Sequence, residues 1–385
     1  MEILEFVDNL MKKTTPAAPA WNLEAANKSA VWNYVDGCMI KAFFDLDRAL
    51  GDLGEKYYDF AVEYLDAFII GDGEGLLGYK TEDYNCDHIN MGKALFYIES
   101  EERKYERVIE LLREQLRKQP RTASGNFWHK RIYPNQVWLD GLYMAQPFYL
   151  EYELKNDGDA SDVFEQFKNV EKNMRDSETG LYYHCFDESR EAFWCDKKTG
   201  KSPHFWLRSI GWFAMALVDC YEKRFYYDYK NETEKRSEDF DYLAKILQEL
   251  VATLSVYEHN GMFYQLPVLG ERSGNYLETS GTCAIAYSLL KGSRLGMLEN
   301  YNKTEKAFDA GKRIFEAVES QKLIKKEDGI VLKDICLVAG LGGMPGKGSY
   351  KVRDGSYEYY ISEPIVENDA KGVAPFLFAY SELCG

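Results

Sequence analysis

Residues 136–153 read QVWLDGLYMAQPFYLEYE, and their apolar side chains return with the period of an α-helix. The apolar members lie three or four positions apart and would form one stripe along the helix: Trp138, Leu142, Ala145, Tyr149 and Tyr152. The same period recurs along the rest of the chain, and Ala307 to Ala317 is a second clear case. The pattern therefore predicts an all-α protein.

The periodicity predicts about twelve helices, with connections of very different length. They are expected over 3–13, 27–51 (with a break near Gly37), 55–71, 88–101, 102–117, 136–153, 160–174, 205–225, 237–256, 277–291, 301–319 and 371–383. No low-complexity linker divides the chain, so residues 1–385 are expected to form one domain. Six helix pairs favour an (α/α)6 barrel, in which inner and outer helices alternate. A solenoid of helix pairs is the alternative, but no fixed-period repeat supports it.

Conspicuous polar residues stand at the beginnings of predicted helices, namely Asp87, Asp140, Arg208, Glu278 and Asp369. With the Trp32 region they mark six helix beginnings. In a ring of alternating helices the inner helices all begin at the same end, so these side chains would meet at one mouth. The helix dipole alone also favours acids at such positions, which weakens the argument.

Composition excludes several classes of protein. The chain of 385 residues carries a net charge of −16, which argues against broad nucleic-acid binding. No signal peptide or membrane-spanning apolar stretch is evident, and eight scattered cysteines without a CxxC pair indicate a reduced, cytoplasmic protein. Neither a metal site nor a nucleotide-cofactor motif is found, so we expect no cofactor. A monomer or a homodimer is expected. Aromatic residues make up 15% of the chain, mostly tyrosine, which suits both cores and sugar-binding walls.

Asp140 is the first candidate for catalysis. Trp138, Tyr143 and Met144 would surround it, and apolar surroundings favour the protonated form of a carboxyl group, which suits proton donation. The helix dipole acts in the opposite direction, so burial would have to dominate. The alternative is a stabilising acid in the first turn of a helix.

Asp87 and His184 each have a plain structural explanation. Asp87, in NCDHINMG (85–92), is a good helix N-cap but would also serve as a second acid at the site. His184 follows a turn at 176–180 in a strand-like segment, where a lone histidine is most often a hydrogen-bonded structural residue.

Trp206, Arg208 and Trp212 lie together near the start of one predicted helix. A guanidinium between two indoles would suit a sugar that carries a carboxylate, because the ring stacks while the carboxylate receives two parallel hydrogen bonds. Lys130 could add positive charge, and such a local cluster would attract an anion despite the acidic net charge. The alternative for Arg208 is capping the C-terminus of a neighbouring helix.

Six segments in this order resemble glycoside hydrolase family 105, the unsaturated rhamnogalacturonyl hydrolases, and more distantly family 88, the unsaturated glucuronyl hydrolases. They are DHIN with Gly92 (87–92), WLDGLYM (138–144), WLRSIGW (206–212), LETSGT (277–282), YYISEP (359–364) and NDAKGV (368–373). The resemblance spans about residues 30–383. It implies an (α/α)6 barrel, in agreement with the helix count.

The resemblance also implies an unusual reaction, connected with pectin degradation. A lyase leaves a 4,5-unsaturated galacturonyl residue at a non-reducing end, and the enzyme hydrates this vinyl ether. An Asp protonates C4, the water it activates adds at C5, and the hemiketal collapses to release the neighbouring sugar. Asp140 matches this acid/base and Asp87 the second acid, while the positions that match substrate contacts are Lys130, His184, Trp206, Arg208 and Trp212. Trp138 and Tyr143 are also expected at the sugar.

Three other functions remain open. An unsaturated glucuronyl hydrolase would act on disaccharides from glycosaminoglycans or related polymers. A sugar 2-epimerase on a similar barrel would need paired histidines, yet only five are present. A non-catalytic carbohydrate-binding protein would not need Asp140. No role is assigned to Cys86, His129 or His204.

Overall fold

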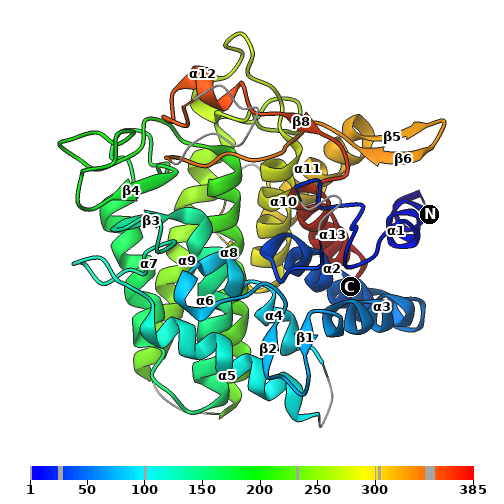
Figure 1. The fold of residues 1–385 in the computed structure, drawn as a ribbon. Coiled ribbons are helices and arrows are strands. Elements are labelled where there is room, and N and C mark those ends of the chain that lie inside the picture. The colour runs from blue at the N-terminus through cyan, green and yellow to red at the C-terminus, as the bar shows by residue number, and fades with distance from the viewer. Residues whose placement is uncertain are drawn as a thin grey trace.

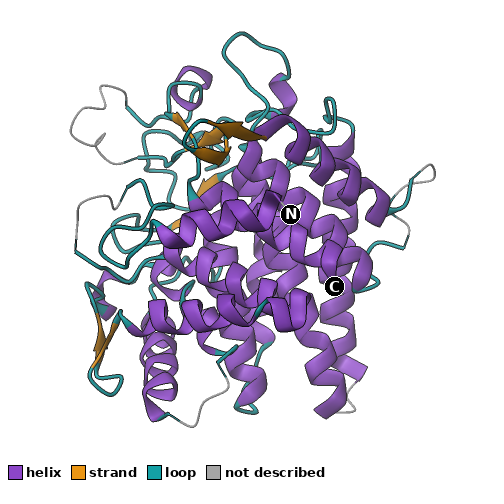
Figure 2. Cartoon of the chain, turned by 90° about the vertical axis from the view of Figure 1, so that its right-hand side faces the viewer, coloured by secondary structure: helices purple, strands orange, loops and turns teal. Residues whose placement is uncertain are grey.

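The computed structural model describes residues 2–24, 29–98, 102–230, 234–299, 301, 305–342 and 352–385, with side chains left out at 224–230 and 234–237. Helices form the body of the molecule (Figure 2). The α-helices are α1 (Glu2–Lys12), α2 (Tyr34–Leu50), α3 (Glu55–Asp66), α4 (Gly92–Leu95), α5 (Arg103–Lys118), α6 (Leu139–Lys155), α7 (Ser161–Met174), α8 (Leu207–Lys230), α9 (Glu234–Ser255), α10 (Thr279–Arg294), α11 (Ala307–Lys322), α12 (Tyr357–Tyr360) and α13 (Ala370–Cys384).

The inner helices close into a ring. Along this ring α2 packs on α4, α4 on α6, α6 on α8, α8 on α10, α10 on α13, and α13 again on α2. Outside them α3, α5, α7, α9 and α11 each pack against an inner helix. This arrangement is the (α/α)6 barrel that the helix count predicted.

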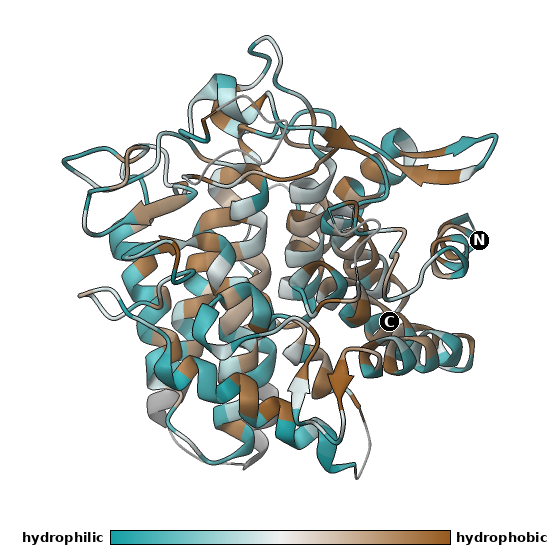
Figure 3. Ribbon diagram, in the orientation of Figure 1, coloured by the Kyte–Doolittle hydropathy of each residue, from teal (hydrophilic) through white to brown (hydrophobic). Residues whose placement is uncertain are grey.

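Burial separates the two kinds of helix. Nearly every residue of α6 from Leu139 to Leu150 is buried, as expected for a helix with neighbours on all sides. The outer helix α3 buries one face only, through Tyr57, Ala61, Tyr64 and Leu65. Figure 3 shows the corresponding alternation of hydrophilic and hydrophobic colour along α3.

Capping side chains define where inner helices begin. Asn33 accepts a hydrogen bond from the backbone N–H of Asp36 at α2, and Asp369 accepts one from Lys371 at α13. Glu278 accepts bonds from the N–H groups of Ser280 and Gly281 at α10. The polar residues noted at helix beginnings therefore lie at the starts of inner helices, except Asp87, which stands in a 3-10 turn before α4.

An internal proline shapes α6. Pro147 has no N–H, so the carbonyl oxygen of Tyr143, four residues earlier, lacks its helical partner. The buried Lys93 of α4 donates to that oxygen over 3.1 Å. An inner helix with a proline thus depends on a side chain from its neighbour.

The strands are short and pair as antiparallel ribbons. They are β1 (Ile69–Ile70) with β2 (Gly75–Leu76), β3 (Gln136–Trp138) with β4 (Cys185–Asp187), β5 (Leu323–Lys326) with β6 (Gly329–Leu332), and β7 (Ile335–Cys336) with β8 (Ile365–Val366). Figure 1 shows β3, β4, β8 and α12 together at one end of the barrel. A second cluster of buried apolar residues, which we call the loop cluster, includes Trp138, Trp206, Cys336 and Tyr360.

Several helix boundaries differ from the prediction. Residues 136–138 form β3, because Asn135 takes a positive φ of 59° that ends the preceding turn, and α6 then begins at Leu139. The helix expected over 88–101 is replaced by a 3-10 turn (Cys86–Ile89) and the short α4. Gly37 does not interrupt α2, which is continuous over Tyr34–Leu50, and α3 ends at Asp66. Residues 27–28, 99–101 and 302–304 of the predicted helices lie outside the described residues.

Candidate active site

Asp140 is the second residue of α6, and the β3–β4 ribbon brings His184 beside it. Trp138 pairs with Cys185 in this ribbon, and the N–H of Leu139 donates to the carbonyl oxygen of His184 over 3.2 Å. The His184 Nε2 atom therefore lies 3.4 Å from Asp140 Oδ2. The imidazole is fully buried, whereas the Asp140 side chain is 14% exposed. This pair combines an acid that solvent can reach with a rigid buried histidine.

Asp87 forms a second pair with Lys130, whose Nζ lies 2.5 Å from Oδ2 of Asp87. Asp87 stands in the 3-10 turn that replaces the predicted helix start, and the N–H of Cys86 donates to the carbonyl oxygen of His129 over 3.0 Å. Burial acts to raise the pKa of Asp87, but Lys130 and His129 lower it below its usual value. Asp87 is therefore an ionised carboxylate.

His129 lies between Asp87 and the start of α6. Its Nε2 is 3.6 Å from Asp87 Oδ1, and a Cβ added to Gly141 would lie 3.0 Å from its Nδ1. Burial lowers the pKa of His129 to about 4, although Asp87 and Asp140 act to raise it. The imidazole is therefore neutral near pH 7. No role was predicted for His129, and its signal in the sequence is only that it precedes Lys130.

Trp138 and Trp206 belong to the loop cluster and are almost completely buried. The ring of Trp138 stacks on His129 at 4.8 Å and on Tyr133 at 5.2 Å, and it meets His184 edge to face. The ring of Trp206 lies 4.7 Å from His184. The two indoles thus hold the histidines of the site.

Arg208 is 2% exposed and directs its guanidinium at the protein itself. Nη1 donates to Ser280 Oγ over 3.3 Å and to the carbonyl oxygen of Cys336, and Nη2 donates to Leu337 O over 3.4 Å. The cation lies 4.6 Å above the ring of Trp206. Arg208 therefore ties α8 to the 336–337 segment, and its contact with a substrate carboxylate stays a prediction.

Trp212 and Tyr143 lie in a different place from the other predicted aromatic contacts. They stack on each other at 4.9 Å inside the main core of the barrel, 2% and 0% exposed. Lys93 Nζ lies 3.3 Å from the centre of the Tyr143 ring. The structure brings these two rings together, but it does not place them in the loop cluster with Trp138 and Trp206.

Two further groups lie at this end: Tyr360 was not predicted from the sequence, and Glu278 was expected only as a polar residue at a helix beginning. Tyr360 donates to or accepts from His184 Nδ1 at 2.8 Å, and it stands in the YYISEP segment without any distinguishing pattern. Glu278 is fully buried, caps α10 and accepts from the N–H of Cys336 over 3.0 Å. Glu278 therefore joins the start of α10 to the same segment that Arg208 holds.

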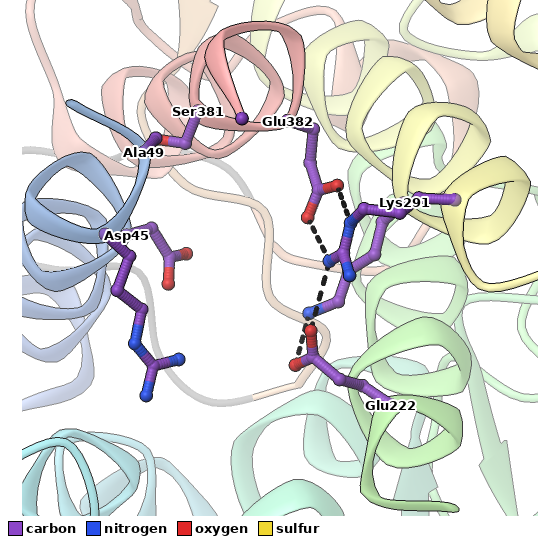
Figure 4. Close-up of a pocket in the computed structure, with 9 residues that line it drawn as sticks. Asp45, Ala49, Glu222, Lys291, Ser381 and Glu382 are labelled. Atoms are coloured by element: carbon purple, nitrogen blue, oxygen red, sulfur yellow. Dashed lines mark hydrogen bonds and ion pairs between the residues drawn. The ribbon is translucent and has the colours of Figure 1, made fainter. Parts of the chain in front are cut away.

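The opposite end of the barrel contains a polar cavity of about 270 Å³. Figure 4 shows that its charged side chains face one another, with Lys291 and Glu222 joined by an ion pair of 2.9 Å. Arg294 bridges Glu222 and Glu382. Four of the charged side chains that line this cavity are paired with each other, namely Lys291, Arg294, Glu222 and Glu382.

The described residues contain no group of three His, Cys, Asp or Glu side chains that could hold a metal ion. Within the same residues, no helix combines the length and apolar character needed to cross a membrane.

Comparison with known proteins defines the class of this protein. The profile of Glycosyl Hydrolase Family 88 matches residues 5–384. The structure of a C. acetobutylicum ATCC 824 glycoside hydrolase from family 105 is similar with a TM-score of 0.85, at 38% identity over 99% of both chains. The protein is thus a glycoside hydrolase. It belongs to the group formed by glycoside hydrolase families 88 and 105.

Two curated proteins and a further structure add detail. Protein Atu3128 of Agrobacterium fabrum is 36% identical over 245 residues, which are 62% of this chain and 97% of that protein. The unsaturated rhamnogalacturonyl hydrolase YesR of Bacillus subtilis is 24% identical over 198 residues, 49% of this chain and 52% of its own. The unsaturated glucuronyl hydrolase of Bacillus sp. GL1 shares the fold, with a TM-score of 0.58 and 16% identity over 91% of this chain and 86% of that one.

Proposed function

We propose that this glycoside hydrolase removes the 4,5-unsaturated galacturonyl residue from rhamnogalacturonan-derived oligosaccharides, with Asp140 as general acid and base. The observation that carries the proposal is the position of Asp140 at the start of an inner helix, partly exposed and backed by the buried His184. YesR, which is named for this activity, supports the choice of substrate.

The reaction needs a single carboxyl group in two successive roles. Protonated Asp140 transfers its proton to C4 of the C4–C5 double bond, and positive charge develops at C5. Water adds at C5 and loses a proton to the Asp140 carboxylate, which restores the acid. The resulting hemiketal opens and the neighbouring sugar leaves. Because no displacement occurs at the anomeric carbon, the usual separation of two glycosidase carboxylates does not apply.

Asp87 is suited to a different task. It is held ionised by Lys130, so it accepts hydrogen bonds and does not donate a proton. We assign it the orientation of a sugar hydroxyl or of the water. Lys130, whose side chain is 23% exposed, offers the substrate carboxylate a cation close to the reacting carbon.

The decisive experiment uses Asp140→Asn and two substrates, an unsaturated rhamnogalacturonan disaccharide and an unsaturated chondroitin disaccharide. The wild-type enzyme should abolish the ultraviolet absorbance of the first much faster than that of the second. Asp140→Asn should lose about 10²- to 10⁴-fold in kcat while circular dichroism stays unchanged. Near-normal activity of the variant would exclude Asp140 as the acid.

A second candidate function is unsaturated glucuronyl hydrolysis, favoured by the shared fold of the Bacillus sp. GL1 enzyme. Faster loss of absorbance from the chondroitin disaccharide would establish it. We further propose a cytoplasmic location, because the eight cysteines are free and seven are buried. For the oligomeric state we propose a monomer or a homodimer. Cell fractionation and light scattering test these two points.

A further inference from the structure

Tyr360 is the last residue of α12, and it reaches the catalytic pair from a segment 176 positions beyond His184. Its hydroxyl lies 2.8 Å from His184 Nδ1, and the residue is fully buried. Gln265 Nε2 donates to its carbonyl oxygen over 2.6 Å, and its ring lies 6.2 Å from that of Trp206. Tyr360 therefore has a fixed position relative to the imidazole.

We propose that Tyr360 is a positioning residue: its hydroxyl donates to His184 Nδ1, which places the imidazole proton on Nε2, the nitrogen that lies 3.4 Å from Asp140 Oδ2. This inference rests on the proposed role of Asp140. It leaves the other carboxyl oxygen of Asp140, on the partly exposed side chain, as the one that exchanges protons with substrate and water.

The tautomer follows from the hydrogen-bond inventory. A neutral imidazole has one donor nitrogen and one acceptor nitrogen, and the bond made by one nitrogen determines the state of the other. Burial raises the pKa of Tyr360 well above its usual value, so the hydroxyl keeps its proton. With the proton on Nδ1 instead, the buried Nε2 lone pair would face the buried Asp140 Oδ2 at 3.4 Å. After Asp140 has given its proton to C4, two acceptors would then meet without a hydrogen between them.

The other titratable groups around the pair leave this assignment unchanged. His129 and Lys130 face it from the segment before β3, and Cys185 faces it from β4. Burial lowers the pKa of His129 to about 4 and raises that of Cys185 well above its usual value, so both are neutral near pH 7. Lys130 is a cation paired with Asp87. The Cys336 thiol, which acts on Tyr360, is also kept protonated, because burial raises its pKa to about 12.

The tautomer can be read directly, without substrate. The chain has only five histidines, so ¹⁵N labelling of histidine gives a simple spectrum, and His184→Gln identifies the signals of His184. In the wild-type protein Nε2 should carry the proton and Nδ1 should accept. A proton found on Nδ1 of His184 overturns the proposal, whatever the activity of the enzyme. This result does not depend on whether Tyr360→Phe folds.

Kinetics test the consequence for catalysis with Tyr360→Phe and the matched control Tyr359→Phe. The Tyr359 hydroxyl donates to Gly340 O and does not contact His184. Tyr360→Phe should lower kcat about five- to tenfold with KM nearly unchanged, and it should move the basic limb of the kcat/KM profile, where Asp140 loses its proton, to higher pH. Tyr359→Phe should leave both as in the wild type.

An unchanged kcat and pH profile in a folded Tyr360→Phe variant would overturn the positioning role. Such a result would leave the proposed function intact, because that function is tested separately by the activity of Asp140→Asn. An active Asp140→Asn variant would exclude the proposed function, while the histidine tautomer would still be measurable.

Discussion

The two acids of the candidate site differ in their surroundings, and the different tasks that we propose for them rest on this difference. Asp87 contacts an ammonium group at 2.5 Å, which keeps it ionised. Asp140 has no cation at such a distance among the described residues and faces the neutral edge of an imidazole. We therefore assign the proton transfer to Asp140 and the hydrogen-bond acceptor role to Asp87.

Lys130→Met tests the electrostatic half of the site. Removing the ammonium group should raise KM for an unsaturated uronate at least tenfold, because both Asp87 and the substrate carboxylate lose their countercharge. Steady-state kinetics at neutral pH provide the measurement. Lys80→Met, at an exposed lysine, is the matched control. Equal KM values in the two variants would show that Lys130 does not meet the substrate.

His129 should make the protein sensitive to acid. Its folded-state pKa is about 4, against 6.5 for an ordinary histidine, mainly because it is buried. Between these values the unfolded chain binds a proton that the folded chain does not bind. The free energy of unfolding should therefore fall as pH drops from 6.5 to 4, by at most about 3 kcal/mol.

Urea denaturation of the wild type and of His129→Gln at pH 6.5 and 4.5 measures this effect. The variant should lose less stability over the interval than the wild type. His259→Gln, at a histidine whose side chain is 40% exposed, should behave like the wild type. If His129→Gln loses as much free energy of unfolding as the wild type between pH 6.5 and 4.5, the acid sensitivity does not come from His129.

At the scale of elements, α8 and α10 approach so closely that glycines are required between them. A Cβ on Gly211 would lie 2.7 Å from the Cβ of Ala284. A Cβ on Gly281 would lie 2.5 Å from Leu207 Cγ and 3.0 Å from the backbone nitrogen of Arg208. This close contact brings the first turns of both helices together, where Arg208 reaches Ser280.

Gly281→Ala should therefore separate the two helix beginnings. We expect a loss of about 1–3 kcal/mol in the free energy of unfolding, as for other overpacked cores, and reduced activity because Arg208 shifts. Denaturation and kinetics measure the two effects. A Cβ on Gly75 would meet only Ile70 Cδ1 at 3.8 Å, so Gly75→Ala is the control. Equal stability of the two variants would show that α8 and α10 can adjust.

At the scale of the whole molecule, the barrel encloses charge as well as apolar side chains. Lys41, Asp219 and Lys291 are nearly fully buried in its interior, and Lys291 Nζ lies 2.7 Å from Asp219 Oδ1. Lys93 lies near this network and donates to the carbonyl oxygen freed by Pro147. Burial lowers the pKa of Lys93 to about 7.

This buried lysine predicts that stability rises with pH. The unfolded chain keeps Lys93 protonated up to about pH 10.5, whereas the folded chain releases the proton near pH 7. The free energy of unfolding should therefore increase between pH 7 and 8.5, by up to about 2 kcal/mol, whereas below pH 7 the penalty for the buried charge is fully present.

Denaturation of the wild type and of Lys93→Met at the two pH values tests this point. The interval stops below the range in which the buried cysteine thiols would act in the opposite direction, since burial raises the pKa of Cys38 from 9.0 to about 11. Lys56→Met, at a half-exposed lysine, should keep the wild-type slope. If the free energy of unfolding still increases with pH in Lys93→Met, another titratable group causes the increase.

Much of the architecture could be read from the chain. Helical period is a local property, so the stripes in 136–153 and 301–319 correctly indicated α6 and α11, and the polar residues at helix beginnings marked the inner ring. The 88–101 helix was wrong, because residues 86–89 form a 3-10 turn and α4 covers only Gly92–Leu95. Helices α5 and α6 pack closely here: a Cβ on Gly92 would lie 2.4 Å from Leu112 and 3.1 Å from Phe148. Such crowding cannot be predicted from a short stretch of sequence, because the contacting residues belong to different helices.

Contacts between side chains that are distant in the sequence could not be predicted from local patterns. Local spacing placed Asp140 and Arg208 near helix beginnings, and the structure agrees. It could not show that Arg208 would give its donors to the carbonyl groups of Cys336 and Leu337, nor that His184 would lie between Asp140 and Tyr360. These contacts join positions more than 40 residues apart, and they form only when the ring of helices closes and the loops pack over it. The local sequence thus determines where the helices lie along the chain. The orientation and the hydrogen-bond partners of the site's side chains are determined only when the barrel closes.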